Sequence, residues 1–208
     1  MNVIFLDIDG VMNSQLFYRA RHRKRWLKLN TYTWWITAKI KFALNGFKPV
    51  YYSLMDYKTP ESHTKFDYLF KRITTETDKE KWKWLSEFCN STDTKICISS
   101  VWKHHFHGNP ETNLEWWNDA LLLLGFKQGT FVGITPSRET LRGTEIQNWI
   151  NKNPVEKYAI IDDDSDMLPE QLCNFFLSDG YVGLTPYMIY RIDRHFKGLN
   201  KLVFTIQK

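Results

Sequence analysis

Two groups of acidic residues each follow a short apolar run, and this spacing is suited to metal-assisted phosphate chemistry. Asp7 and Asp9 follow Val3 to Leu6, and the triplet 162–164 follows a second apolar run, with Asp166 two residues further on. At about 4 Å and an effective dielectric constant of about 20, each like-charged pair would cost roughly 4 kcal/mol. A hard divalent cation removes this repulsion, and oxygen-only ligands favour Mg²⁺. The chain has no His or Cys spacing that indicates zinc.

Hydroxyl and guanidinium groups accompany these acids. The apolar run Lys95 to Ser99 ends in Ser99 and Ser100, and a hydroxyl there can hydrogen-bond a phosphate oxygen. Arg142 opens a predicted helix, where a cation can neutralise phosphate charge and restrain nearby aspartates. Each signal alone has an ordinary explanation, since acids and serines at element ends are commonly caps or turns. Their order along the chain and their positions at strand ends favour a catalytic site.

The elements that must position these residues are strands alternating with helices. Apolar runs predict strands, and helical spacing of apolar residues predicts helices. The predicted strands are Val3 to Leu6, Lys95 to Ser99, Phe131 to Ile134, Tyr158 to Ile161, a short one near Val182, and Leu202 to Ile206. The predicted helices are Thr77 to Asn90, Leu114 to Leu124 with Gly125 as C-cap, Thr144 to Asn151, and Tyr187 to Phe196. This α/β alternation predicts a mostly parallel sheet covered on both faces. Ligands bind beyond the carboxyl ends of such strands, so both acidic groups should share one edge.

Residues 14–75 interrupt this alternation and are basic and aromatic. We expect two helices there, near Leu16 to Leu29 and Trp34 to Leu44. The basic residues are Arg19, Arg21, Arg23, Lys24, Arg25 and Lys28, and the aromatic ones include Tyr18, Trp26, Trp34 and Trp35. Such a mixture suits a nucleotide or single-stranded nucleic acid. A solvated basic helix over an aromatic core and an amphipathic helix on a membrane surface remain alternatives.

Net charge, cysteine content and hydropathy limit the kinds of partner and the compartment that we expect. The formal net charge of +5 suits an anionic substrate. The alternative is that the charge reflects amino-acid composition without a functional role. Three cysteines without CxxC spacing fit a reducing compartment, with Cys97 expected in the core. The N-terminal stretch lacks the features of a signal peptide, and no apolar run reaches membrane-spanning length. We therefore expect a cytoplasmic protein. His104, His105 and His107 are expected in a loop or at a cleft rim rather than on a metal.

The motifs resemble those of the haloacid dehalogenase (HAD) superfamily of phosphohydrolases. The similar segments are FLDIDGVMN, ICISS, Arg142 about twenty residues before the last motif, and AIIDDDSDM. A narrower resemblance is to the HAD phosphatase domains of RNA-repair proteins, related to the phosphatase half of polynucleotide kinase-phosphatases. It is carried by DIDGVMN, SSVWK, LRGTEIQNWI, IIDDDSDM and GLT, within residues 1–13 and 77–186. The resemblance implies a HAD-like Rossmannoid three-layer sandwich with a core of residues 1–13 and 76–208. Residues 14–75 would form a helical, cap-like insertion after the first strand.

The resemblance also implies roles for individual residues. Asp7 would be the nucleophile and Asp9 the general acid and base, while Ser99 and Arg142 would hold the phosphoryl group. The predicted Mg²⁺ ligands are Asp7, the backbone carbonyl of Asp9, Asp162 and Asp163, with Asp166 supporting them, and the resemblance leaves open which acids bind directly and which bind through water. The predicted substrate contacts are Ser100, Lys103 and Arg138. Two positions depart from the family pattern, because its usual lysine appears as Arg142, with Arg138 as the other choice, and its usual arginine appears as Lys103.

The function that the resemblance implies is a Mg²⁺-dependent phosphomonoesterase. It would act through an aspartyl-phosphate on the phosphate end of a nucleotide or polynucleotide. Two alternatives stay open. One is a non-catalytic nucleic-acid-binding protein on a HAD scaffold, although such a protein has no need for a costly acidic cluster. The other is a phosphotransferase that passes the same phosphoryl group to an alcohol or a sugar.

Overall fold

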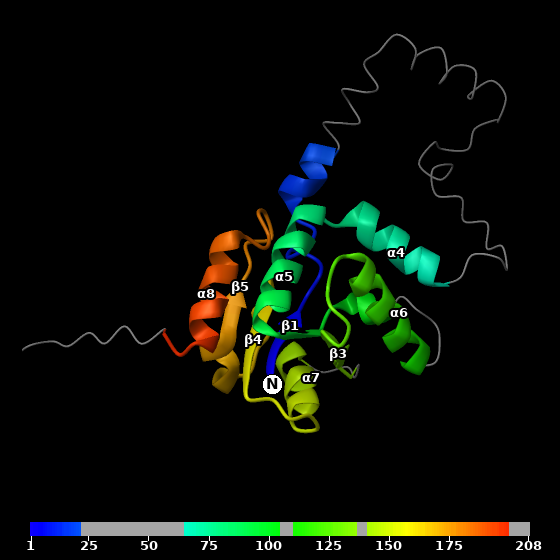
Figure 1. Cartoon of the computed structure of the whole chain (residues 1–208). Helices are drawn as coiled ribbons and strands as arrows, with labels where there is room; N and C mark the ends of the chain where they lie inside the picture. Colours follow the sequence, from blue (N-terminus) through cyan, green and yellow to red (C-terminus); the bar gives the residue numbers. More distant parts are fainter. Residues whose placement is uncertain (22–64, 105–109, 137–140, 200–208) are drawn as a thin grey trace, which may run out of the picture.

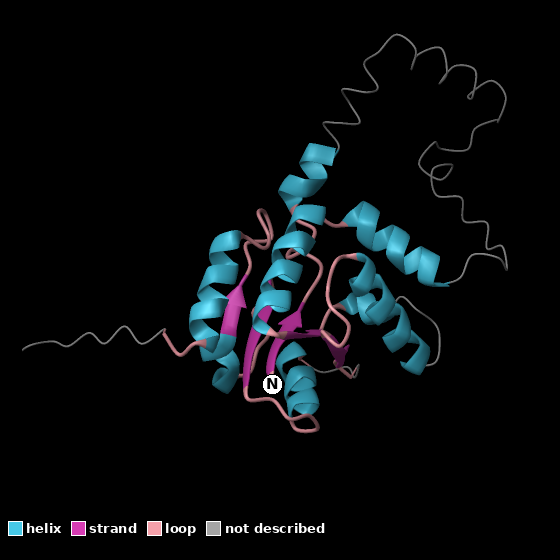
Figure 2. Cartoon of the chain, viewed as in Figure 1, coloured by secondary structure: helices cyan, strands magenta, loops and turns pink. Residues whose placement is uncertain are grey.

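The strands of the protein form one parallel sheet (Figure 1). A computed structural model describes residues 1–21, 65–104, 110–136 and 141–199. Within them, five strands lie in the order β3-β2-β1-β4-β5, and all neighbours are parallel. The strands are β1 (Asn2–Leu6), β2 (Lys95–Ile98), β3 (Phe131–Ile134), β4 (Lys157–Asp162) and β5 (Phe175–Leu177). Because every strand is parallel, all the carboxyl ends lie at one edge, toward which the arrows in Figure 2 point.

Helices cover both faces of this sheet. The helices are α4 (Lys65–Glu76), α5 (Lys79–Thr92), α6 (Pro110–Leu123), α7 (Arg142–Ile150) and α8 (Pro186–Phe196), with short 3₁₀ helices η1 (Val101–His104) and η2 (Pro169–Asn174). Side chains of β1 alternate between two cores, because successive residues of a strand face opposite sides. Ile4 and Leu6 pack in the core formed with α4, α5, α6 and α8, while Phe5 packs with α7 through Ile146 and Trp149. The predicted three-layer α/β sandwich is confirmed.

Local signals fix the helix ends near their predicted positions. Asp78 caps α5, because its side chain accepts a hydrogen bond from the backbone NH of Glu80 at 3.0 Å. Gly125 follows α6 with a positive φ of 94°, as expected of a C-cap. These signals indicate where α5 begins and where α6 ends.

The strand predicted near Val182 is wrong. Residues 180–182 form a turn, and the last described strand is β5, from Phe175 to Leu177. A run of three residues is too short to show an alternation, so the pattern pointed to the wrong segment. The closing strand predicted at Leu202 to Ile206 lies outside the described residues.

Only the two ends of the predicted insertion lie within the described residues. Residues 15–21 are helical, which agrees with the start of the helix predicted near Leu16 to Leu29. The helix α4 was not predicted. Ile73 of α4 is fully buried in the main core, so core packing begins before residue 76. The helix predicted at Trp34 to Leu44 lies outside the described ranges, and the cap-like character of 14–75 stays a prediction.

Two further observations concern the compartment. Cys89, Cys97 and Cys173 are free, and Cys97 is buried in the core as predicted. None of the helices in the described ranges has the length and hydropathy needed to cross a membrane. The cytoplasmic location stays a prediction.

Candidate active site

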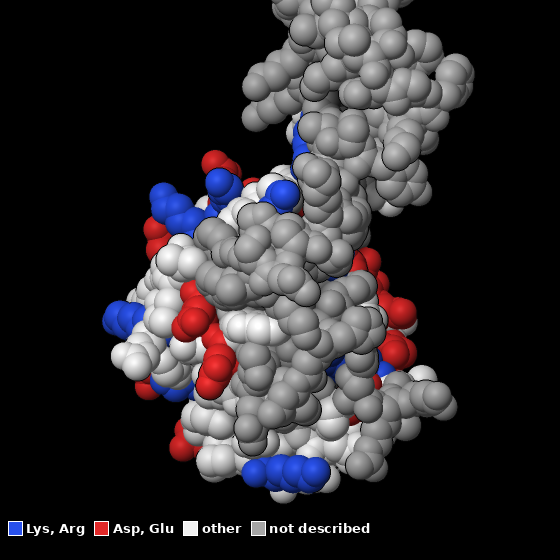
Figure 3. Space-filling model, turned by 90° about the vertical axis from the view of Figure 1, so that its right-hand side faces the viewer, with Lys and Arg blue, Asp and Glu red and all other residues white. Residues whose placement is uncertain are grey.

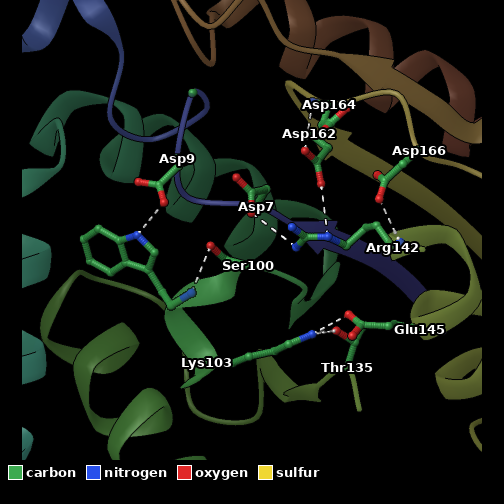
Figure 4. A network of polar contacts seen from close by, with 12 residues as sticks. Asp7, Asp9, Ser100, Lys103, Thr135, Arg142, Glu145, Asp162, Asp164 and Asp166 are labelled. Atoms are coloured by element: carbon green, nitrogen blue, oxygen red, sulfur yellow. Dashed lines mark hydrogen bonds and ion pairs between the residues drawn. The ribbon is translucent and has the colours of Figure 1, made fainter. Parts of the chain in front are cut away.

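The two acidic groups meet at the carboxyl edge of the sheet (Figure 4). β1 and β4 pair with Leu6 opposite Ile161, and the backbone NH of Asp7 donates to the carbonyl of Ile161 at 3.0 Å. Asp7 follows Leu6 and Asp162 follows Ile161, so this register places Asp7 beside Asp162. Carboxylate oxygens of Asp7, Asp162 and Asp163 all lie within 4.8 Å of one another. The predicted convergence of the two distant acidic segments is therefore present.

Burial of these acids changes their proton affinity. Loss of hydration raises the pKa of Asp7 to about 6, against the opposing effects of the Arg142 charge and of hydrogen bonding by Ser100. Burial, followed by the charge of Asp7, raises the pKa of Asp162 to about 7. Burial also raises the pKa of Asp163, whose side chain is more exposed. The cluster therefore resists full ionisation unless positive charge is added.

Arg142 supplies one positive charge to this cluster. Its guanidinium lies 3.3 Å from an oxygen of Asp7 and 3.7 Å from an oxygen of Asp162. The start of α7 holds it there. The backbone NH of Arg142 donates to the Asp166 carboxylate at 3.0 Å, and the NH of Gly143 donates to the Asp166 carbonyl at 3.2 Å. Asp166 thus caps the helix that carries the arginine, and its predicted support of the metal ligands stays a prediction.

The two serines after β2 have different surroundings. Ser99 is fully buried, and among the described residues its hydroxyl has no hydrogen-bond partner. Ser100 is also buried, but its side chain interacts with Asp7 and lowers the pKa of that carboxyl. The sequence analysis gives Ser99 as the phosphoryl contact and Ser100 as a further substrate contact. The geometry favours Ser100 as the hydroxyl beside the nucleophile candidate.

Asp9 stands apart from the buried acids, in an exposed position held by two donors. The indole NH of Trp102 donates to one carboxylate oxygen at 3.0 Å, and the amide of Asn13 donates to the other at 2.7 Å. Asn13 also donates to the hydroxyl of Tyr18 at 3.0 Å. Sequence reasoning missed Trp102 and Asn13 as supporting residues. Both residues lie within the motifs that carry the family resemblance, but the motifs alone do not indicate that they contact Asp9.

The remaining predicted substrate contacts are placed as follows. Lys103 is buried, and its ammonium donates to Glu145 at 2.6 Å and to Thr135 at 2.7 Å (Figure 4). Burial lowers the pKa of Lys103, against the opposing effect of Glu145. In this arrangement the lysine joins η1 to α7 inside the protein. Arg138, His105 and His107 lie outside the described residues, and the substrate role of Lys103 stays a prediction.

Comparison with known proteins decides the family. A family model described as "HAD domain in Swiss Army Knife RNA repair proteins" matches residues 3–188. The chain belongs to this family. No curated protein and no solved structure matches the chain significantly.

The glycine of the first HAD motif is required by the acids themselves. Gly10 has a φ of +68°, a conformation that residues with a side chain adopt at a steric penalty. A β-carbon at this position would also overlap with the carboxylate of Asp163. The backbone of the turn after β1 therefore lies directly against Asp163, the acid that follows the neighbouring strand β4.

The HAD site fits a divalent cation. Three carboxylates against one guanidinium leave a formal excess of two negative charges. One Asp162 oxygen is buried with no hydrogen-bond partner among the described residues, although Arg142 lies nearby. Hard carboxylate oxygens at this spacing suit Mg²⁺. The residues present are therefore those that such an ion would need.

Proposed function

We propose that the protein is a Mg²⁺-dependent phosphomonoesterase that uses Asp7 as its nucleophile. The family membership supports a HAD-type phosphohydrolase. The observation that carries the finer proposal is the difference between the two aspartates of the first motif. Asp7 is buried beside Arg142 and two further acids, while Asp9 is exposed and oriented by neutral donors.

In the first step, an Asp7 carboxylate oxygen attacks phosphorus and the bond from phosphorus to the ester oxygen breaks. Asp9 in its acid form gives its proton to the departing oxygen, so that an alcohol leaves. Arg142 and the Ser100 hydroxyl stabilise the charge on the transferred phosphoryl oxygens. An aspartyl-phosphate on Asp7 is the product of this step.

In the second step, water attacks the phosphorus of the aspartyl-phosphate. Asp9, now ionised, takes a proton from this water, and the bond between phosphorus and Asp7 breaks. Inorganic phosphate leaves and both aspartates return to their starting states. The donors Trp102 and Asn13 keep Asp9 in place through both proton transfers.

A Mg²⁺ ion would be held by Asp7, Asp162 and Asp163, with the backbone carbonyl of Asp9 as a further ligand. When bound, it would neutralise charge on the phosphoryl group and on the acids themselves. The raised pKa values of Asp7 and Asp162 support this proposal, because a cation would keep both acids ionised at neutral pH.

The proposed substrate class is the phosphate end of a nucleotide or polynucleotide. The description of the family as a domain of RNA-repair proteins supports this choice. Arg19 and Arg21 belong to the described part of the basic segment that follows the first motif, and Arg19 contacts Tyr181 in the turn that follows β5. Their charge favours a polyanion over a neutral ester.

The experiment is a phosphate-release assay with Mg²⁺ and with EDTA. It compares mononucleotides, 3′- and 5′-phosphorylated oligonucleotides and sugar phosphates, using wild type, Asp7→Asn and the exposed-acid control Asp119→Asn. We expect EDTA to abolish release and Asp7→Asn to reduce it by ~10³-fold or more, with the control unaffected. Wild-type-like turnover by Asp7→Asn would refute the mechanism. Phosphorylated product from an added alcohol would indicate a phosphotransferase instead.

A further inference from the structure

The turn between β5 and α8 brings an exposed tyrosine next to the acidic cluster. A β-carbon placed on Gly180 would lie 2.9 Å from a carboxylate oxygen of Asp163. The hydroxyl of Ser178 donates to the carbonyl of Gly10 at 3.0 Å, which fixes this turn to the first motif. Tyr181 therefore stands one residue beyond the point where the turn touches the proposed metal site.

Arg19 covers this tyrosine from a distant part of the chain. Its guanidinium lies 5.2 Å from the centre of the Tyr181 ring and donates to the ring hydroxyl at 3.2 Å. Backbone bonds hold the two segments together, from the NH of Gln15 to the carbonyl of Gly180 and from the NH of Leu16 to the carbonyl of Tyr181. Despite these contacts, the tyrosine is 39% exposed. A rigidly held aromatic ring and a cation thus face solvent together.

A second aromatic pair follows in the first turns of α8. Tyr187 and Tyr190 are 69% and 52% exposed, and their rings stack with centres 6.3 Å apart. The guanidinium of Arg194 lies 5.9 Å from the ring of Tyr190 and donates to its hydroxyl at 3.2 Å. Contiguous exposed apolar groups, rather than single ones, mark binding surfaces, and these two rings are in stacked contact.

The pairing of rings with arginines, rather than charge alone, distinguishes this surface. Figure 3 shows a different side of the molecule, that of α4 and α6, where acidic and basic side chains of the described residues are interspersed among uncharged ones. Exposed rings flanked by arginines are suited to single-stranded nucleic acid, since bases stack on aromatic faces while guanidinium groups meet phosphates. A sugar phosphate has no base to stack on these rings and should gain less from them than a nucleotide.

We propose that Tyr181 and Arg19 form a base-stacking subsite for the nucleotide whose phosphate enters the acidic cluster. Tyr187, Tyr190 and Arg194 form a second platform for a further nucleotide of the same single strand. This inference rests on the proposed phosphatase function and specifies its substrate as single-stranded. It assigns the surface to recognition through base faces rather than through base edges, so turnover should depend little on base identity.

The test compares a nucleoside monophosphate, ribose 5-phosphate and a phosphorylated single-stranded oligonucleotide. We expect Tyr181→Ala to lower kcat/KM roughly tenfold for both base-bearing substrates and to leave ribose 5-phosphate unchanged. Tyr181→Phe keeps an aromatic ring but removes the hydroxyl that Arg19 contacts, so it should lose less than Tyr181→Ala. The double variant Tyr187→Ala/Tyr190→Ala should impair only the oligonucleotide. Leu123→Ala, an exposed apolar residue on α6, is the control and should impair no substrate.

Two results would overturn the subsite. One is an equal loss for Tyr181→Ala on all three substrates, which would mean a structural role in the turn. The other is no loss on any of them. Should wild type release no phosphate from any substrate, the proposed function fails, and fluorescence anisotropy with the labelled oligonucleotide still decides the subsite. Binding that weakens in Tyr181→Ala would support it, and binding equal to wild type would overturn it.

Discussion

At the residue scale, the two aspartates of the first motif differ in what surrounds them. Asp7 is buried against Arg142 and Asp162, whereas Asp9 is exposed and accepts hydrogen bonds from Trp102 and Asn13. A group that must carry a phosphoryl group benefits from fixed positive charge. A group that must exchange protons with a leaving group and with water benefits from exposure and a fixed orientation. These different environments support the division of roles that we propose for Asp7 and Asp9.

Trp102 is predicted to orient Asp9 for proton transfer. Trp102→Phe keeps the ring, over which Arg72 lies at 4.0 Å, but removes the indole donor. We expect kcat to fall by ~10-fold with KM little changed. The loss should be larger for alkyl phosphates than for p-nitrophenyl phosphate, because a good leaving group needs no proton. Steady-state kinetics on both substrate types measure this.

A matched control separates this role from general destabilisation. Trp82→Phe removes a buried indole donor to Thr77, 2.6 Å away, without touching Asp9. It should lower stability and leave the leaving-group dependence at the wild-type value. Equal losses on both substrate types in Trp102→Phe would contradict the orienting role.

The serine pair gives a second prediction at this scale. Ser100→Ala should lower kcat/KM by ~10-fold or more, since its hydroxyl hydrogen-bonds Asp7, the proposed nucleophile. Ser99→Ala removes a buried hydroxyl that has no partner among the described residues, so it should change activity little. Assays of the two single variants check this order. The reverse order would restore the assignment that the sequence alone favoured.

At the element scale, a buried ion pair joins η1 to α7. Lys103 and Glu145 are 3% and 10% exposed in their side chains, with nitrogen and oxygen 2.6 Å apart. Glu145 stands one turn beyond Arg142, so the pair ties the segment after Ser100 to the helix that carries the guanidinium. Breaking such a pair leaves an uncompensated buried charge.

Lys103→Met is therefore expected to destabilise the protein by ~3–5 kcal/mol, measured by denaturant unfolding. The double variant Lys103→Met/Glu145→Leu should recover much of this loss, because it leaves no buried charge behind. KM for a phosphorylated substrate distinguishes the two roles of Lys103. A higher KM that the double variant fails to recover would favour the predicted substrate contact over the structural pair.

The elements that carry the motifs could be predicted from sequence, and the contacts between them could not. Val3 to Leu6 and Tyr158 to Ile161 were identified as strands because each is an apolar run that ends in acids. β5 was missed because three residues are too few to show a pattern. The contact between Trp102 and Asp9 joins residues 93 positions apart, and no local spacing encodes such a contact.

The choice between Ser99 and Ser100 could not be settled from sequence, for a related reason. An apolar run that ends in two serines marks a strand end, but the run alone does not say which hydroxyl faces the neighbouring strand. The pairing of β1 with β2 and the turn after Ile98 decide this. Asp7, Asp162, Asp163 and Arg142 were placed together correctly because the shared edge of a parallel sheet is a property of the fold class.

At the scale of the whole molecule, the acidic cluster opposes folding when no cation is bound. The pKa values of about 6 for Asp7 and about 7 for Asp162 lie above the ordinary value of 3.8. The folded state therefore binds protons more tightly than the unfolded state. Stability of the metal-free protein should fall as pH rises from about 4 through about 7, and the full penalty should be present at higher pH.

Thermal unfolding with EDTA and with Mg²⁺ at pH 5 and pH 8 tests this linkage. The Mg²⁺-induced rise in Tm should be large at pH 8 and small at pH 5, because protons compete for the same oxygens. In EDTA at pH 8, Asp7→Asn should be more stable than wild type, by ~1 kcal/mol or more. Asp119→Asn should behave as wild type. A Mg²⁺ effect independent of pH, or a destabilised Asp7→Asn, would contradict a cation at this cluster.

Covalent transfer to Asp7 is the claim on which the account rests, and trapping the intermediate tests it most directly. Turnover of a phosphorylated oligonucleotide is quenched in acid, and the digested protein is examined by mass spectrometry. We predict one phosphoryl group on the peptide that contains Asp7, removable by hydroxylamine and missing in Asp7→Asn. Steady release of phosphate without any modified peptide, together with an active Asp7→Asn, would contradict the account.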